Sequence, residues 1–229
     1  MTGGSHIAPH DPRTPGALAD RWAVALLRVP GGTHTFSVSL RDIEADTAWA
    51  RRVFERMGLQ RGLPAHLIGA GFDYAILWPY ENALMGLNVP FGVAEPVAID
   101  APRTDMLLRR LRMQAVVGLT GEIVAALLAL GRDLPSLLGH STLAALPDAT
   151  GVLREAGLRP WTVLPLGPLW AFEPPEGGGA DYDRSEWLVE TIDGELVVSS
   201  MAARATPWRQ LRTGVRGRIA ADGRVLCES

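Results

Sequence analysis

Segments typical of strands and of helices alternate along most of this chain, and the alternation constrains the fold more than any other feature. Strand-like runs at 64–69, 97–99, 115–118 and 161–166 are separated by segments whose apolar residues recur every three or four positions, as in helices. Alternation with short connections predicts a parallel sheet covered by helices. We therefore predict an α/β core subdomain over residues 21–166.

The pattern changes after Gly167, where closely spaced strands replace the alternation. Two strand-like runs, 187–192 and 195–200, flank the pair Asp193-Gly194. Asp-Gly between such runs is a strong hairpin signal, because both turn positions must tolerate positive φ. We predict a smaller β-rich subdomain over residues 167–229.

Composition limits the classes of partner. The chain is 47% apolar and its formal net charge is -3, which fits a globular protein with a real core and gives no basic face for nucleic acid or an acidic membrane. No run is long enough to cross a bilayer, and the start lacks a charged-then-apolar leader. We expect a cytoplasmic protein that binds neither nucleic acid nor membrane. Residues 1–20, rich in Gly and Pro, predict a flexible tail.

The chain contains no lysine, so all 22 of its basic residues are arginines. Arginine stays charged and cannot serve as an amine base or form a Schiff base. Chemistry that needs a lysine, including lysine-assisted adenylation, is therefore closed to this chain acting alone. The single cysteine, Cys227, excludes an intrachain disulfide and any metal site built from several cysteines.

Three stretches in the last quarter of the chain carry a family resemblance. They are Trp187-Leu188-Val189-Glu190, the run from Asp193 to Ser200 and the run from Pro207 to Gly214. Read together, they resemble the end of the large domain of adenylate-forming (AMP-dependent) acyl- and aryl-CoA ligases, in particular the phenylacetate-CoA ligase branch. The resemblance extends over roughly residues 36–227 and implies a truncated, degenerate ligase with part of that fold.

The positions that would contact ATP in that family are altered. The resemblance places a ribose-binding Arg-Thr-Gly-Asp turn at Arg212, but its fourth residue is Val215, which cannot accept the ribose hydrogen bonds. The phosphate loop is reduced to Gly31-Gly32-Thr33 without a lysine, and the Tyr-Gly-x-Thr-Glu motif keeps only Gly167. We expect no ATP, no magnesium and no zinc, hence no cofactor and no metal.

In that family an acyl pocket is lined by a segment that corresponds to residues 69–80. With the strand end that follows, it gives the predicted substrate-binding residues Phe72, Tyr74, Trp78, Tyr80, Gly167 and Trp170. These would face one another at the ends of the parallel strands, where open α/β sheets bind ligands. The alternative is that the aromatic rings fill the core. No catalytic residue is assigned; the ionisable candidates expected at the rim are Glu81, His66 and Arg212.

The sequence is compatible with three functions. The first is a non-adenylating, ligase-like protein of a biosynthetic pathway that binds, or processes without ATP, a carboxylic, aromatic or polyketide-like molecule. The second is an interaction protein, a pseudoenzyme subunit, that associates with a copy of itself or with another chain. The third is an acyl-CoA or aryl-acid ligase completed in trans by a partner that carries the missing lysine.

Overall fold

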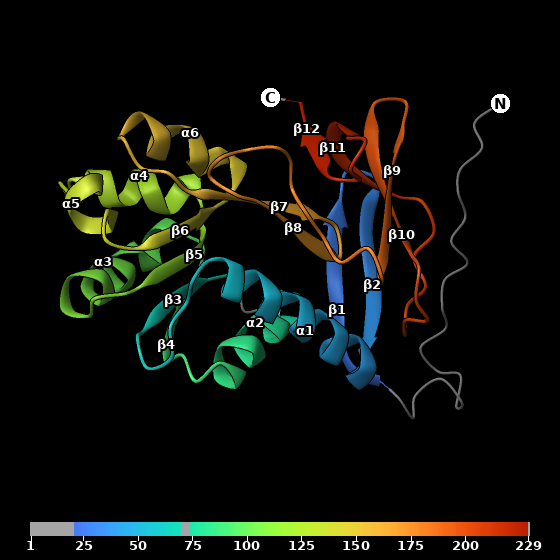
Figure 1. Ribbon diagram of the computed structural model, residues 1–229, viewed down its shortest axis with the longest axis horizontal. Helices are drawn as coiled ribbons and strands as arrows, with labels where there is room; N and C mark the ends of the chain where they lie inside the picture. Colours follow the sequence, from blue (N-terminus) through green and yellow to red (C-terminus); the bar gives the residue numbers. More distant parts are fainter. Residues whose placement is uncertain (1–20, 70–73, 229) are drawn as a thin grey trace.

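The computed structural model describes residues 21–69 and 74–228. Within them the chain forms a six-stranded sheet with helices on both faces, a four-stranded antiparallel sheet and a separate two-stranded hairpin (Figure 1). The predicted α/β class with a β-rich part after it is confirmed. The tail predicted at 1–20 lies outside the described residues.

The six-stranded sheet has the order β4-β3-β5-β6-β7-β8, in which β8 alone runs antiparallel to its neighbour. Its strands are β3 (Ala65–Ile68), β4 (Phe91–Ala94), β5 (Ala115–Leu119), β6 (Thr142–Ala145), β7 (Trp161–Leu166) and β8 (Leu169–Glu173). The turn Gly167-Pro168 joins β7 to β8, so the predicted subdomain boundary at residue 167 falls between neighbouring strands of one sheet. The prediction of a strand at 97–99 is wrong, because most of that segment belongs to the 3-10 helix η3 (Ala98–Asp100).

Helices cover both faces of this sheet (Figure 1). On one face lie α1 (Leu40–Arg56) and α2 (Tyr74–Gly86); on the other lie α3 (Ala101–Arg110), α4 (Gly121–Ala129), α5 (Leu134–Leu138) and α6 (Pro147–Glu155). At the start of α1 the Ser39 hydroxyl accepts a hydrogen bond from the Asp42 amide, and the Asp42 carboxylate accepts one from the Ser39 amide. This reciprocal cap fixes where α1 begins. None of the helices in the described part of the chain is long and apolar enough to span a membrane.

The hairpin precedes α1 and consists of β1 (Arg21–Val29) and β2 (Gly32–Ser39), joined by Pro30-Gly31. The sequence stretch interpreted as a reduced phosphate loop is therefore a tight turn followed by the start of a strand. Side chains alternate between the two faces of the hairpin, as the pleat requires. Leu27 and Phe36 are buried on the inner face, whereas Val24 and Leu26 are 59% and 54% exposed.

The four-stranded sheet has the order β12-β11-β10-β9. Its strands are β9 (Trp187–Ile192), β10 (Glu195–Ser200), β11 (Leu211–Ile219) and β12 (Val225–Cys227). The hairpin predicted from Asp193-Gly194 is confirmed, with φ of 54° and 77° at the two turn residues. Isolated bridges from Ala180 to β12 and from Asp181 to β8 connect this sheet to the larger one.

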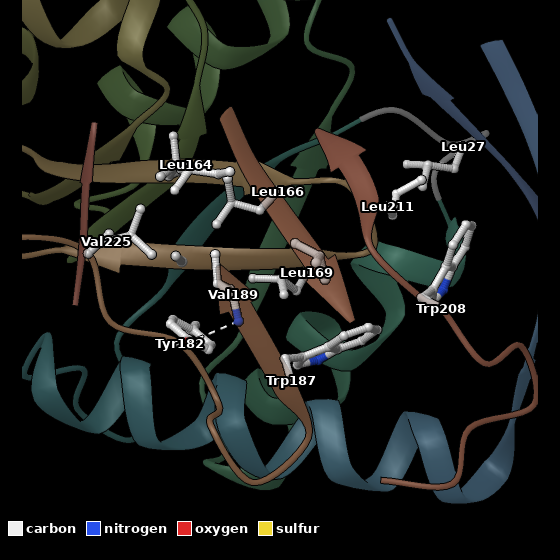
Figure 2. Packing of buried hydrophobic residues seen from close by; sticks show 14 of the residues in the cluster. Leu27, Leu164, Leu166, Leu169, Tyr182, Trp187, Val189, Trp208, Leu211 and Val225 are labelled. Carbon is white, nitrogen blue, oxygen red and sulfur yellow. Dashed lines mark hydrogen bonds between the residues drawn. The ribbon is translucent and has the colours of Figure 1, made fainter. Parts of the chain in front are cut away.

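A single apolar cluster joins the hairpin, the four-stranded sheet and the β7–β8 turn. Figure 2 shows Leu27 beside Leu211, with Trp208 below them, and Leu169 between Trp187 and Leu166. The Tyr182 hydroxyl accepts a hydrogen bond of 3.4 Å from the Val189 amide inside the cluster. The inner face of the hairpin therefore packs on the β-rich part of the chain.

A buried ion cluster attaches the loop between β10 and β11 to α1. Arg204, whose side chain is 5% exposed, forms ion pairs with Asp46, with Glu186 at 3.1 Å and with Asp42 at 3.6 Å. Arg41 also binds Glu186. Three carboxylates thus share two arginines, and burial raises the pKa of Asp46 to about 6.

We expect Asp46→Asn to change the pH dependence of stability. The raised pKa means that the folded chain favours protonated Asp46, so the wild type gains stability relative to the variant as the pH falls from 7 to 4.5. The gain should be about 2 kcal/mol, since each pKa unit corresponds to about 1.4 kcal/mol. Urea denaturation of both proteins at the two pH values measures it. Glu44→Gln, an exposed position on the same helix, is the control, and a wild-type-minus-variant difference that stays constant with pH contradicts the prediction.

Candidate functional site

A cleft of about 510 Å³ lies at the carboxyl ends of the parallel strands. One wall consists of the residues that end or follow β3, β5, β6 and β7, among them Ile68, Gly118 and Leu146. The opposite wall is the continuous run of β1 from Val24 to Val29. Residues of α2 and of the β7–β8 region also line the cleft, among them Ile76, Leu77, Gly167 and Trp170.

The topology of the sheet explains why the cleft lies there. The chain leaves β3 toward α2 on one face and leaves β5 toward α4 on the other, so a crevice opens between the ends of two adjacent strands. Gly118, at φ 88°, allows close approach at this point, since a Cβ atom there would lie 2.1 Å from the Ile68 carbonyl oxygen. The position predicted for ligand binding therefore coincides with a real cleft.

The lining is mainly aliphatic, and few of its polar groups are available to a ligand. The Thr120 hydroxyl caps α4 by accepting from the Ile123 amide. The Thr213 hydroxyl donates to the Leu196 carbonyl oxygen at 2.8 Å. The guanidinium of Arg28, by contrast, has no ion pair or hydrogen bond within the described part of the chain. Arg28 is thus the group in this lining that is free to hold an anion.

Of the predicted substrate-binding residues, Gly167 and Trp170 line the cleft. Tyr74 and Trp78 lie on α2 and stack on Trp22 of β1, with ring centroids 6.1 and 5.5 Å from the Trp22 ring, and they are not among the lining residues. Phe72 lies outside the described residues.

Tyr80 occupies the core. Its buried ring contacts Phe54 of α1 and Trp170 and Phe172 of β8, with centroid separations of 6.1, 4.8 and 5.9 Å. Burial raises the pKa of Tyr80 well above its ordinary value. The alternative prediction, that the aromatic rings fill the core, therefore fits the surroundings of Tyr80.

The three ionisable candidates lie apart from one another and from the cleft lining. His66 is fully buried in β3, where Nδ1 donates to the Gly92 carbonyl oxygen at 3.1 Å and Nε2 accepts from Thr104 at 3.0 Å. Burial lowers the pKa of His66, which keeps the ring neutral. Glu81 lies on α2, and partial burial raises its pKa. Arg212 is exposed and pairs with Glu195 at 2.6 Å.

Sequence reasoning missed the contribution of β1, above all Arg28. The sequence gives little signal for this strand, because the run before Pro30-Gly31 is almost continuously apolar. The alternation of exposed and inward residues is visible only in the structure. Gly118 was also missed, although a glycine inside a strand often marks close approach of another backbone.

Several solved structures have a fold similar to that of this chain. A 2-hydroxyisobutyryl-CoA ligase, crystallised with 2-HIB-AMP and CoA, superposes with a TM-score of 0.71 over 92% of this chain and 56% of its own, at 15% identity. An o-succinylbenzoate CoA synthetase from Bacillus subtilis gives 0.65, covering 92% and 49% at 10% identity. A putative long-chain-fatty-acid CoA ligase from Rhodopseudomonas palustris gives 0.58, covering 90% and 58% at 13% identity.

The fold is that of part of an adenylate-forming ligase. The chain spans about half the length of these structural relatives. No family model matches the sequence, and no curated protein matches it. The shared fold therefore supports the predicted architecture, while the low identity leaves activity to be argued from the cleft itself.

The packing of α2 predicts different losses of stability when two of its tyrosines are replaced by alanine. Tyr80→Ala should cost about 3 to 5 kcal/mol, because it empties a buried site among aromatic rings. Tyr74→Ala should cost less than about 1 kcal/mol, because Tyr74 is 41% exposed. Chemical denaturation of the two variants beside the wild type measures both costs. Equal losses would show that the ring stack on Trp22 is as important to the fold as the core.

Proposed function

We propose that this chain is a non-adenylating, ligase-like protein that binds a small carboxylic acid with an acyl or aromatic body in the cleft at the strand ends. The observation that carries the proposal is the combination of an aliphatic lining with one cation, Arg28, that has no partner among the described residues. Ligand sites typically pair an apolar cavity with a few placed polar groups that fix orientation. A carboxylate at Arg28 with its apolar body along Leu77 and Leu146 fits that description.

The residues at the nucleotide-binding positions support a function without ATP. Val215 stands where the resemblance implies a ribose-binding carboxylate. Its amide donates a hydrogen bond to the Thr213 hydroxyl at 3.1 Å. The turn at Pro30-Gly31 is closed by strand pairing from Val29 to Gly32 and leaves no extended loop to surround phosphates. We propose descent from the phenylacetate-CoA ligase branch, with the acyl end of the site kept and the nucleotide end lost.

Arg28→Gln should weaken binding of phenylacetate or octanoate at least tenfold, because a hydrogen bond to a charged group contributes about 1.5 to 3 kcal/mol. Isothermal titration calorimetry measures the dissociation constants. Arg218→Gln removes an exposed arginine of β11 and should leave them unchanged. If the acids bind the wild type and Arg28→Gln equally well, the cation has no role in recognition.

ATP with magnesium should not bind measurably at millimolar concentration, since the chain has no lysine and lacks the ribose-binding carboxylate. The same calorimeter and protein preparation test this. A dissociation constant below about 100 µM, equivalent to more than about 5.5 kcal/mol, would show that backbone groups alone hold the nucleotide and would restore adenylation as a candidate activity.

A further inference from the structure

Among the residues that the structure describes, no further strand lies beside either edge of the β1–β2 hairpin. Across residues 21–69 and 74–228, β1 pairs with β2 and with no other strand. The far edge of β2 is covered at Ser37, whose amide donates to the Thr206 hydroxyl at 2.8 Å and whose carbonyl oxygen accepts from that hydroxyl at 3.1 Å. Within residues 21–69 and 74–228 the edge of β1 from Val24 to Val29 has no such contact.

The register shows which main-chain groups of β1 point away from β2. The amide and carbonyl of Ser37 are bound to Thr206 and therefore point away from β1. Ser37 and its partner Val24 thus form a non-hydrogen-bonded pair, in which the amide and carbonyl of Val24 point away from β2. The pairing continues without a shift to the turn, so Leu26 and Arg28 share this orientation. Three amides and three carbonyls thus point outward at every second residue.

This edge faces the cleft. Consecutive residues from Val24 to Val29 all line it, both those whose side chains are exposed and those whose side chains point inward. A cavity that touches only one face of a strand would be lined by alternate residues. The cleft therefore extends along the main-chain edge, over roughly 20 Å at about 3.3 Å per residue.

We infer that the cleft takes a linear, amide-bearing acid: a short extended peptide with apolar side chains and a free carboxylate, added to β1 as a third strand. Peptide addition to an open sheet edge supplies main-chain hydrogen bonds, and alternate side chains enter apolar pockets. The inference rests on the proposed function in placing a carboxylic acid in this cleft, and it names the class of that acid. With its carboxylate at Arg28, the peptide would run parallel to β1.

A second copy of the chain is disfavoured as the occupant. The wall opposite β1 belongs to the same chain and consists of the ends of β3 and β5. Neighbouring strands lie about 4.8 Å apart, whereas packed sheets need about 10 Å. A recess with a facing wall suits one extended chain better than the edge of another folded molecule.

The first test varies the ligand and leaves the protein intact. Acetyl-Leu-Val-Leu with a free carboxylate, the same peptide methylated at its amide nitrogens, and decanoate are titrated into the wild type. The unmethylated peptide should bind at least tenfold tighter than the methylated one, because methylation removes the N–H donors. Equal affinity of the two peptides overturns the inference; decanoate binding in that case leaves the proposed function standing. If neither peptide nor acid binds, both proposals are overturned.

The second test varies the edge. Leu26→Pro removes an amide that points away from β2, a position where an edge strand tolerates proline, and Leu26→Ala removes the side chain but keeps the amide. Peptide affinity should be at least tenfold weaker in Leu26→Pro than in Leu26→Ala, whereas decanoate affinity should be the same in the two variants, because both lack the leucine side chain and they differ chiefly in the main-chain amide. Circular dichroism and melting confirm that both variants are folded. Tight peptide binding to folded Leu26→Pro would overturn main-chain recognition.

Discussion

Burial of the inner face of the hairpin is the interaction on which the site depends. Leu27 and Phe36 pack with Trp208 and Leu211 of the β-rich part, in a cluster that also includes Leu166 of β7 (Figure 2). A two-stranded hairpin is marginally stable by itself, so this apolar contact is what holds it in place. Because the hairpin is attached to the four-stranded sheet, its β1 edge faces the ends of the parallel strands across a gap, and that gap is the cleft.

Polar contacts decide which edge of the hairpin stays open. Thr206 binds both main-chain groups of Ser37, and the adjacent Ala205 amide donates to Asp42 at 3.0 Å. The buried Arg204 cluster holds this loop in place through α1. Removing one partner from such a buried cluster leaves an uncompensated buried charge, which costs several kcal/mol, about 3 to 5. The cluster therefore resists separation of the loop from α1, although buried ion pairs add little net stability to a fold. The hairpin is thereby held along β2 at Ser37, whereas its β1 edge stays open with respect to the described residues.

Local signals predicted the elements that local chemistry determines. The Asp193-Gly194 turn is confirmed because it depends on residues adjacent in the chain, as the Ser39 cap also does. Strand β6 was missed because its sequence ends in Leu-Ala-Ala, and alanine is disfavoured in strands on propensity alone. It becomes a strand because it is buried between β5 and β7. Arg28 could not be assigned, since its role depends on where a hairpin packs far along the chain.

Helix α2 shows why a list of aromatic residues was a poor guide to the ligand. Successive residues of a helix are rotated by about 100°, so one segment contacts several surroundings. Tyr80 faces the core, Tyr74 and Trp78 stack on Trp22, and Ile76 with Leu77 line the cleft. Most side chains that the cleft presents are therefore aliphatic, with Trp170 at one side. Such a lining offers few flat faces to an aromatic ring and more surface to an extended aliphatic chain, so an aliphatic body fits the acid that we propose as ligand better than an aromatic one does.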